Sequence, residues 1–416
     1  MRVLVMGGNY HWQPRLRAIS PSVESAMLCT VSALHWVHEL ERPHVVVGLD
    51  DGLPAEEWVR AASRLHHDWP IDVVASLNDI DQDKAQAVAA GLGLPFHSAR
   101  TVVCARDKSA MREELAAAGV EDVPHRQLRS PEELRAFLVE VGPPLLVKPT
   151  AGRGGHGVTF VRSVDQVDAA FRRARDWNPK GMPDVPLAER FVDGEEFSVE
   201  AITHDGHHYI VAITEKFKDK STLVEIGHLV PARIPGGVAD AVVGHVRRVL
   251  TALGVHYGLT HTEVIVGANG PVTVETHLRK GGDEIEGLVR DATDINLPDL
   301  YLRQLLGEDI GRRPELRERA ELPHYHASGA IRYLAPDLSG TLVGIHGWDE
   351  ARARPGVVLT RQLKPTGIVL DGLRSSDDRL GCVRVTASDP HGAAALAESC
   401  VDLLRVECIR ADRHDG

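Results

Sequence analysis

The sequence has little cysteine and no long apolar run. Its five cysteines are odd in number and form no C-x-x-C pair, so neither a disulfide framework nor a thiolate zinc site is indicated. A reducing, cytoplasmic location is therefore expected. No apolar stretch approaches the roughly 18 residues that a membrane-spanning helix needs. The apolar run at residues 2–6 ends too early for the core of a signal peptide, so neither export nor membrane insertion is expected.

Positive charge is also in short supply. Lysine and arginine total 47 against 59 aspartates and glutamates, which gives a net charge of -12. This excess opposes general attraction to nucleic acids and anionic lipids, so we expect neither nucleic acid nor a membrane as a partner. An anionic ligand would need a local basic pocket. Aromatic residues make up only 5%, but the 43% of hydrophobic residues suits a globular protein, and 416 residues predict several domains with clefts.

Short apolar segments alternate with helical segments over the first hundred residues. Strands are predicted at 3–6, 45–48 and 71–76, and segments of helical period lie at 55–65 and 83–90. This alternation is typical of a parallel sheet with helices on its faces. We therefore predict an N-terminal α/β domain.

The rest of the sequence predicts a small lid and an antiparallel sheet. A helix is expected at 108–118, and strands at 145–148 and 158–161 flank a glycine-rich turn. Further strands are expected at 196–201, 209–214, 259–266, 271–276, 329–334 and 381–386, before a last helix at 392–404. The predicted fold class is a mixed α/β and α+β multi-domain protein. Its units are an N-terminal parallel α/β domain (1–105), a linker helix with a mobile lid (106–188), an antiparallel-sheet catalytic core (189–322) and a C-terminal α+β subdomain packed on the core (323–416).

The glycine-rich turn at 152–157 matches G-x-G-x-x-G literally. The dinucleotide-binding reading of that pattern needs a helix after the last glycine, but β-forming residues follow at 158–161. A hairpin tip without β-carbons can instead lay backbone N–H groups on a polyphosphate. Its candidate contacts are Gly154, Gly155, His156 and Gly157. The alternative is a flexible surface hairpin with no ligand.

Two lysines flank this turn. Lys148 ends an otherwise apolar strand just before the turn, and Lys108 begins the predicted helix forty positions earlier. A lone lysine is usually a solvated surface residue, but two lysines beside a glycine loop are better explained as point charges for phosphates. The arrangement indicates ATP.

A second hairpin carries paired carboxylates. If its loop is the three residues 268–270, then Glu263 lies directly opposite Glu275, and His261 lies opposite His277. A two-residue loop would slip the register by one residue and separate the two carboxylates. Facing carboxylates repel each other unless a cation lies between them, and oxygen ligands suit Mg²⁺, with Mn²⁺ as a possible substitute. The alternatives are an exposed strand face with unrelated acids, or zinc bound through the histidine pair.

Taken in order, these residues resemble the pattern of the ATP-grasp ligases. They are Lys108, Lys148, the turn at 152–157, the segment 189–200, Glu263, and the segment 275–279. Within that superfamily the chain is most similar to the L-amino acid (dipeptide) ligases, because of Glu225 to His228, His261 to Glu263 and the spacing from Glu275 to Arg279. The resemblance covers essentially the whole chain and is densest between residues 108 and 282.

The resemblance implies a role for each residue. Lys108 and Lys148 would contact the phosphates of ATP, and Glu196 would reach the ribose hydroxyls. The adenine would lie beside Glu189, Arg190, Phe191 and Val192. Glu263 and Glu275 would hold Mg²⁺, Arg279 would face the substrate carboxylate and the charge that develops in phosphoryl transfer, and His228 would line the amino-acid pocket.

Two positions depart from the pattern. Most of the superfamily has asparagine where this chain has His277, so we treat His277 as a candidate metal ligand whose role is open. His156 takes a loop position that often carries a small hydroxyl residue.

The implied activity is that of an ATP-dependent ligase that joins a small-molecule carboxylate to an amine, with amino acids as the expected substrates, as a possible homodimer. Another ATP-grasp reaction, such as carboxylation or a purine-pathway ligation, and a nucleotide-binding module without turnover are the alternatives.

Overall fold

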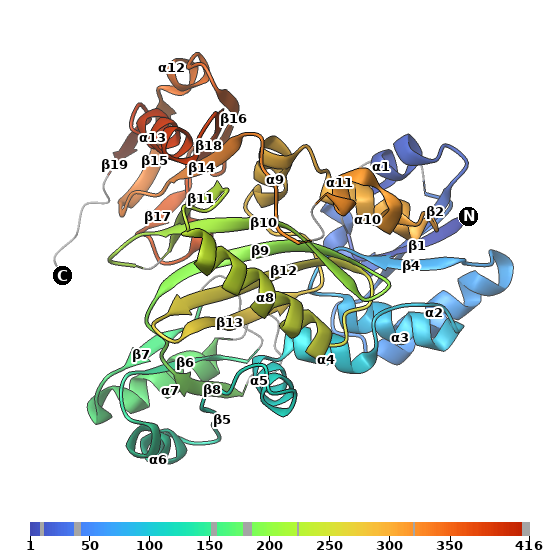
Figure 1. The fold of residues 1–416 in the computed structure, drawn as a ribbon, viewed down its shortest axis with the longest axis horizontal. Coiled ribbons are helices and arrows are strands. Elements are labelled where there is room, and N and C mark those ends of the chain that lie inside the picture. Colours follow the sequence, from blue (N-terminus) through green and yellow to red (C-terminus); the bar gives the residue numbers. More distant parts are fainter. Residues whose placement is uncertain are drawn as a thin grey trace.

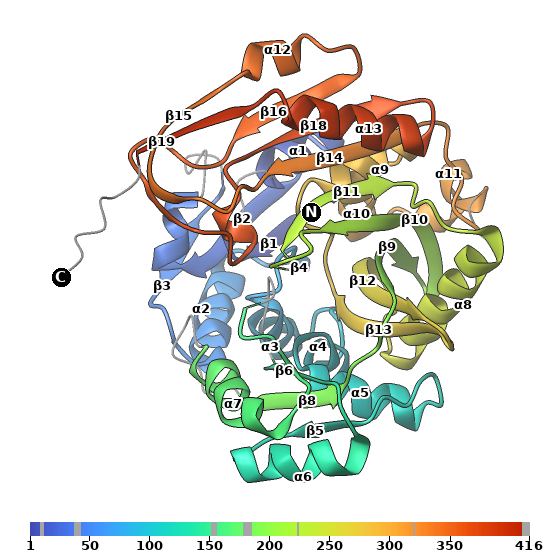
Figure 2. The same cartoon turned by 90° about the vertical axis from the view of Figure 1, so that its left-hand side faces the viewer.

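A parallel sheet forms the N-terminal part of the chain. The computed structural model describes residues 1–8, 12–36, 43–150, 156–177, 185–222, 224–318 and 321–409. The first strands are β1 (Arg2–Met6), β2 (Glu24–Thr30), β3 (Val46–Leu49) and β4 (Val73–Ser76). They pair in parallel in the order β3-β2-β1-β4 (Figure 2). The predicted α/β domain is thereby confirmed, although the strand β2 was not predicted.

Helices cover both faces of this sheet. They are α1 (Trp12–Ile19), η1 (Val31–Trp36), α2 (Ala55–Asp68) and α3 (Gln82–Leu92), whereas the next helix, α4 (Ala99–Arg106), packs in the core of the central sheet. Leu4 of β1 packs with Trp58 of α2 and Val88 of α3, whereas its neighbours Val3 and Val5 belong to a separate cluster. Because successive residues of a strand point to opposite faces, the continuous apolar run of β1 reflects burial on both sides.

Helix α5 (Lys108–Ala117) follows directly. The Asp107 side chain accepts hydrogen bonds from the backbone N–H groups of Ser109 and Ala110, which caps the helix at its first turn. Gly119, at a φ of 66°, provides the left-handed residue that ends it. The predicted helix is confirmed, and its cap fixes Lys108 at the first helical position.

The lid is a small antiparallel sheet. Its strands are β5 (His125–Gln127), β6 (Leu145–Pro149), β7 (Thr159–Val161) and β8 (Pro186–Arg190), in the order β5-β8-β6-β7 (Figure 1). The helices α6 (Pro131–Val141) and α7 (Val167–Asp176) lie on it, with η2 (Val164–Gln166) leading into α7. Ser130 caps α6 and Pro131 occupies its first turn.

The central element is an eight-stranded antiparallel sheet. Its strands are β9 (Glu195–His204), β10 (His207–Lys218), β11 (Glu225–Val230), β12 (Gly258–Gly267), β13 (Gly270–His277), β14 (Ser328–Leu334), β16 (Val357–Gln362) and β18 (Gly381–Ala387). They follow the order β13-β12-β9-β10-β11-β14-β18-β16, and α8 (Gly236–Ala252) lies along one face (Figure 1). The predicted antiparallel sheet is confirmed. Its pairing runs without a break from β11 to β14, so one sheet spans the predicted core and the C-terminal subdomain.

The C-terminal subdomain adds a three-stranded sheet. The strands β15 (Ser339–His346), β17 (Val369–Asp371) and β19 (Arg405–Ile409) pair in the order β17-β15-β19. The other elements are α12 (Trp348–Arg352), η4 (Ser376–Asp378) and α13 (Pro390–Val401). The last helix was predicted at 392–404; the observed helix begins two residues earlier, at Pro390, and ends at Val401. The strand β19 that follows it was not predicted.

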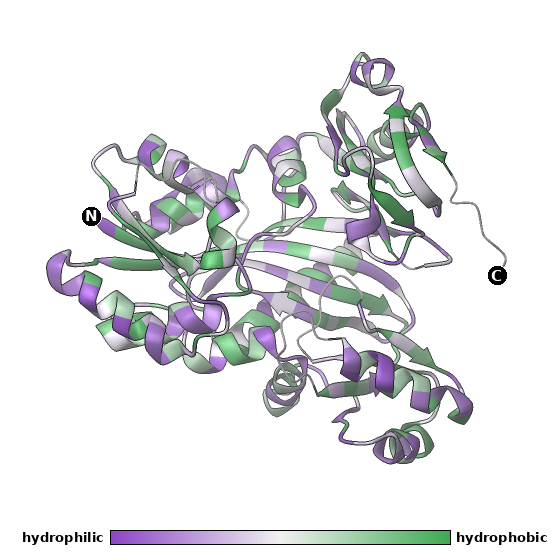
Figure 3. Cartoon of the chain, turned by 180° about the vertical axis from the view of Figure 1, so that it is seen from behind, coloured by the Kyte–Doolittle hydropathy of each residue, from purple (hydrophilic) through white to green (hydrophobic). Residues whose placement is uncertain are grey.

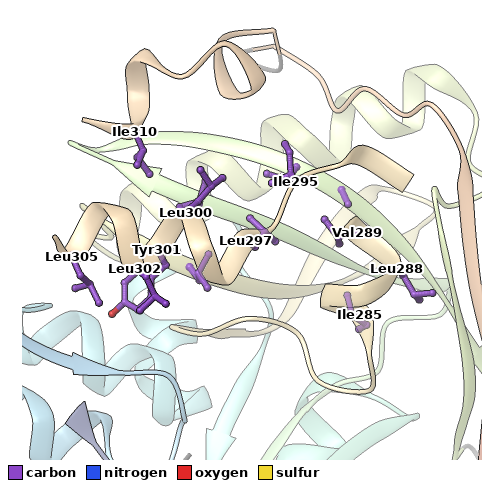
Figure 4. Close-up of a cluster of buried hydrophobic side chains, with 14 of the residues drawn as sticks. Ile285, Leu288, Val289, Ile295, Leu297, Leu300, Tyr301, Leu302, Leu305 and Ile310 are labelled. Atoms are coloured by element: carbon purple, nitrogen blue, oxygen red, sulfur yellow. The ribbon is translucent and has the colours of Figure 1, made fainter. Parts of the chain in front are cut away.

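A shared core joins the parallel sheet to the central sheet. Helices α9 (Ile285–Thr293) and α10 (Leu297–Leu305) bury Ile285, Leu288, Val289, Leu297, Leu300 and Leu302 there, and η3 (Ile310–Arg312) and α11 (Pro314–Arg317) follow (Figure 4). The same cluster contains Val5 of β1 and Val211 of β10. Figure 3 shows the strands of the parallel sheet largely in green, the hydrophobic end of its scale, whereas the strands of the central sheet also carry hydrophilic segments. None of the helices in the described ranges is both long and apolar enough to cross a membrane.

The buried residue His97 should make the protein less stable at acidic pH. The ring of His97 stacks on Tyr257 at 4.5 Å between centroids, and its Nδ1 has no hydrogen-bond partner among the described residues. Burial, and then the nearby His256, lower the pKa of His97 to about 4. Because this pKa lies below the unfolded value of 6.5, the unfolded chain takes up the proton first as the pH falls.

We therefore expect the free energy of unfolding to decrease between pH 6.5 and about 4, by about 3 kcal/mol from this residue, and to be unaffected by it above pH 7. His97→Phe keeps the stacked ring and should flatten this dependence in urea unfolding. Part of the slope should remain, since burial, then Arg247, also lower the pKa of His208 to about 4. Identical slopes in wild type and variant would contradict the assignment, and exposed His391→Gln is the control.

Candidate active site

The hairpin of β12 and β13 brings the candidate metal ligands together. Glu263 lies opposite Glu275, and His261 lies opposite His277, which confirms the predicted register. The two carboxylates therefore share one face of the central sheet.

The turn of this hairpin differs from the prediction. Gly267 pairs with Gly270, so the loop has two residues rather than three, and this alone would shift the register. A β-bulge corrects the shift: Val264 pairs with Thr273, whereas Glu263 pairs with Glu275, and Val274 is left over. The three-residue loop was therefore wrong, and the bulge gives the same alignment at the carboxylates.

Two rows of polar side chains cross the strands β9, β12 and β13. The first row is Glu200, His261 and His277, and the second is Ser198, Glu263 and Glu275. The Nδ1 atom of His261 lies 2.7 Å from Oε1 of Glu200, and the rings of His261 and His277 stack with centroids 5.9 Å apart. Burial would lower the pKa of His261, but Glu200 and then Glu263 raise it to about 10. His261 is therefore protonated at neutral pH, and its Nε2 lies 3.3 Å from Oε1 of Glu263 in the second row.

Each carboxylate of the pair is matched with a lysine. The Nζ atom of Lys108 lies 2.7 Å from Oε2 of Glu275, and that of Lys216 lies 2.8 Å from Oε1 of Glu263. Burial alone would raise the pKa of both carboxyls, but these lysines and the adjacent histidines hold both pKa values well below their usual range. Both groups are therefore ionised at neutral pH.

Lys216 is a site residue that the sequence prediction missed. It is only 1% exposed, and its Nζ also lies 2.7 Å from Glu196 and 2.6 Å from Glu225. Lys218 forms a second ion pair with Glu196. A signal was present, because Lys216 and Lys218 alternate along the end of a strand and so share one face with spacing two. Only the tertiary arrangement shows that three carboxylates surround one of them.

Lys148 lies in a buried ion network. Its Nζ is 2.5 Å from Oε1 of Glu189, and Nε of Arg112 lies 3.1 Å from Oε2 of the same carboxylate. Burial would raise the pKa of Glu189, but Lys148 and Arg112 lower it to about 2. The Glu189 side chain is thus fixed between Lys148 of the lid sheet and Arg112 of helix α5.

The glycine turn is only partly described. Gly154 and Gly155 lie outside the described residues. Gly157 has a φ of 73°, and a β-carbon there would come within 2.9 Å of the Pro149 ring, so glycine is required. The His156 ring stacks on Trp177 at 5.8 Å, and its Nε2 lies 3.9 Å from Asp377 of the C-terminal subdomain.

The predicted adenine segment follows β8. The ring of Phe191 meets that of Phe160 edge to face, with centroids 5.1 Å apart. The backbone N–H groups of Arg190 and Phe191 donate to the carbonyls of Pro124 and Pro144. The adenine contacts of Glu189, Arg190, Phe191 and Val192 and the ribose contact of Glu196 stay predictions.

His228 lies in a second charged cluster beside the first. It is 1% exposed, and its Nε2 is 3.2 Å from Oδ2 of Asp283 and 3.8 Å from Oε2 of Glu225. Both terminal nitrogens of Arg379 donate to Asp283 at 2.7 Å, and its guanidinium lies 3.8 Å from the ring centroid of Tyr333. Since Glu225 also contacts Lys216, this cluster is continuous with the carboxylate pair.

The backbone beneath this cluster is strained. Asp283 and Glu284 have φ values of 50° and 63°, although neither is glycine. Left-handed residues of this kind cost free energy and gather at functional sites. The sequence prediction missed Asp283, Arg379 and Tyr333, because no local pattern links residues so far apart along the chain.

Arg279 is held by the N-terminal domain. Its Nε lies 2.5 Å from Oδ2 of Asp79, and its Nη1 donates to the carbonyl of Lys280 at 2.7 Å. The other oxygen of Asp79 lies 3.3 Å from Nδ1 of His277. No described residue engages Nη2 of Arg279, which leaves that nitrogen for a ligand. Asp79, in the loop that follows the parallel strand β4, was also missed.

The residues present fit a hard divalent ion. Glu263 and Glu275 offer ionised oxygens on one face, as Mg²⁺ prefers. Both ring nitrogens of His277 already meet carboxylates, and its pKa is raised by Glu275 and Asp79 against the effect of burial, which favours a supporting role for it. Two further sets, Glu196 with Glu225 and Glu263, and Glu225 with His228 and Asp283, also bring ligand atoms within 4.8 Å of one another.

Comparison with known proteins finds matches over two parts of the chain. Residues 141–286 match the ATP-grasp domain, and residues 332–408 match the L-amino acid ligase C-terminal domain 2. An uncharacterized protein from Sinorhizobium fredii is 28% identical over 349 residues, which cover 82% of this chain and 69% of that protein. An alanine–anticapsin ligase from Bacillus subtilis is 25% identical over 336 residues, which cover 74% of this chain and 69% of the relative.

Solved structures show the same fold over almost the whole chain. The L-amino acid ligase from Bacillus licheniformis superposes with a TM-score of 0.80 at 20% identity, covering 98% of this chain and 99% of that one. A biotin carboxylase domain from Hydrogenobacter thermophilus, in complex with MgADP, gives 0.70 at 14% identity over 98% and 91%. The first family match contains Lys148, both carboxylates of the pair and Arg279.

Proposed function

Given that the chain is an ATP-dependent ligase of the ATP-grasp superfamily with the C-terminal domain of L-amino acid ligases, we propose that it forms an amide bond through an acyl phosphate. Its substrates are two amino acids, or an amino acid and a small carboxylic acid. The observation that carries the proposal is the carboxylate pair, Glu263 and Glu275. Each of the two forms an ion pair with a lysine, and Arg279 follows Glu275 by four residues.

The chemistry requires activation of a carboxylate. An ionised acid does not acylate an amine at neutral pH, because oxide is a poor leaving group. Transfer of the γ-phosphoryl group of ATP to a carboxylate oxygen gives an acyl phosphate and ADP. The neutral amine of the second substrate then attacks the carbonyl carbon, the C–O bond to phosphate breaks, and the amine nitrogen loses its proton.

The residues of the site supply charge and position. Lys108 and Lys148 hold phosphate oxygens, and the fork of Arg279 orients the substrate carboxylate with its unengaged Nη2. Glu263 and Glu275 would hold Mg²⁺, which when bound neutralises charge on the phosphates. Closure of the lid keeps water from the acyl phosphate.

The cluster at His228 suits an amino-acid ammonium group. Glu225 and Asp283 supply acceptor oxygens near His228, whose Nδ1 has no partner among the described residues. An ammonium group has three donors and would be met by such a set. This favours an amino acid over bicarbonate, although a carboxylation like that of the biotin carboxylases would use the same ATP residues. Assembly as a homodimer is also a proposal.

A phosphate-release screen tests the function. Purified protein with Mg·ATP is offered amino acids and small carboxylic acids, singly and in pairs, and phosphate and coupled product are measured. We expect phosphate release only with certain pairs, in equal amount to an amide product. Release with bicarbonate alone would favour carboxylation, and tight ATP binding without ADP formation in any mixture would favour a binding module.

A further inference from the structure

Helix α5 presents two cations on one face. Lys108 at its first position reaches Glu275, and Arg112 lies four residues later. Residues at this spacing are neighbours on a helix surface. Arg112 does not face the carboxylate pair, however, so its role must be read from its own contacts.

Arg112 connects two carboxylates that belong to different parts of the site. Its Nε lies 3.1 Å from Glu189, the partner of Lys148, and its Nη1 lies 2.6 Å from Oε1 of Glu121. The side chains of Lys148, Glu189, Arg112 and Glu121 are each no more than 7% exposed. A guanidinium presents its donors in a rigid planar fork and can hold two carboxylates in a fixed geometry, whereas a lysine ammonium is a compact point charge on a flexible stem.

Glu121 extends the network to the bulge in β13. Its Oε2 accepts the backbone N–H of Thr273 at 2.8 Å and lies 3.2 Å from Nε2 of His245. Thr273 is the last residue paired in the shifted register before Val274 is left over and Glu275 aligns with Glu263. The carboxylate of Glu121 therefore fixes the strand at the point where the register is corrected.

We propose that Arg112 and Glu121 are positioning residues that hold the nucleotide lysine and the metal carboxylate in one geometry. Through Glu189 they fix Lys148, and through the N–H of Thr273 they fix the bulge that orients Glu275. The inference rests on the nucleotide and metal roles proposed above. Arg112 and Glu121 themselves touch neither ATP nor metal.

The test uses two variants that keep size and polarity. Arg112→Lys keeps the charge but loses the planar fork that spans Glu189 and Glu121. Glu121→Gln keeps an acceptor oxygen but loses the charge that Arg112 pairs with. Titration calorimetry of ATP in excess Mg²⁺ should show about tenfold weaker binding for both, in line with the effect of losing groups that hold metal ligands in place. When ATP affinity is measured at increasing Mg²⁺ concentrations, both variants should need more Mg²⁺ to reach half of the full gain in affinity.

Three comparisons decide the outcome. Arg384→Lys changes another buried arginine, which pairs with Asp291 and Glu284 outside this network, and should bind Mg·ATP within about twofold of wild type. A lowered melting temperature with unchanged affinity in both test variants would overturn the inference, as would failure of both to fold, since either result assigns the pair to core stability alone. Lys148→Met tests the site itself: if it binds Mg·ATP normally the proposed nucleotide site is wrong, whereas if it alone binds weakly only the role of Arg112 and Glu121 fails.

Discussion

Glu275→Gln should abolish ADP formation, with a loss of at least about a hundredfold in turnover, because it removes an ionised ligand at nearly constant size. The amide would also place an uncharged group against Lys108 and His277, both of which now face a carboxylate. The measurement is ADP release under saturating Mg·ATP and the best substrate pair. The fold should survive, since the side chain keeps its length and the hairpin register depends on the backbone.

The control for this variant is Glu215→Gln. Glu215 precedes Lys216 on β10, so its side chain points to the opposite face of the sheet, where it pairs with Arg233 at a nitrogen-to-oxygen distance of 2.5 Å. It tests whether loss of any glutamate ion pair in this sheet lowers turnover. Full ADP formation by Glu275→Gln would refute the metal role.

Arg279→Lys should lower turnover by about a hundredfold or more, although the charge is kept. Arg279 uses Nε to contact Asp79 and Nη1 to contact a carbonyl, and it still has Nη2 available. A lysine ammonium lacks the planar fork that lets Arg279 present separate nitrogens to Asp79, to the Lys280 carbonyl and to a ligand. We expect kcat to fall and the KM for the carboxylate substrate to rise, while the affinity for Mg·ATP measured by calorimetry changes little.

Arg233→Lys is the matched control for Arg279→Lys. Arg233 also donates from two nitrogens, in its case to the carboxylate of Glu215, but on the other face of the sheet. Normal activity of the Arg279 variant would dismiss the proposed contact with the substrate carboxylate. A drop in Mg·ATP affinity equal to the drop in turnover would instead assign Arg279 to the nucleotide.

The hairpin shows why a correct prediction can rest on an incomplete reason. The sequence places Glu263 and Glu275 at a spacing that aligns them across a three-residue loop. Asn269-Gly270 also favours a tight turn, and the fold uses the tight turn together with a bulge at Val274. Nothing local distinguishes the two solutions, because the bulge is held by Glu121 from a distant loop.

Ion pairs between residues that are far apart in the sequence could not be predicted. Lys108 and Lys148 could be singled out because a glycine turn lies near them, and the carboxylate pair because a turn brings it together. Lys216, Arg112 and Asp79 have no such local mark, and their partners come from other strands and domains.

The missed strand β2 illustrates a related limit for the fold. Its central residues, Ala26, Met27 and Leu28, have good helix propensity, and only burial between two parallel neighbours makes them a strand.

The continuity of the central sheet bears on how this enzyme could be re-engineered. The backbone of β11, which carries His228, is hydrogen-bonded to β14, and Arg379 and Tyr333, both beyond residue 322, contact Asp283 beside His228. A chimera that exchanges the C-terminal third with that of a relative would break these backbone hydrogen bonds and replace both partners of Asp283 in the same step. With the role in amino-acid binding that we propose for this cluster, substrate preference and structural integrity would be inherited together from that segment.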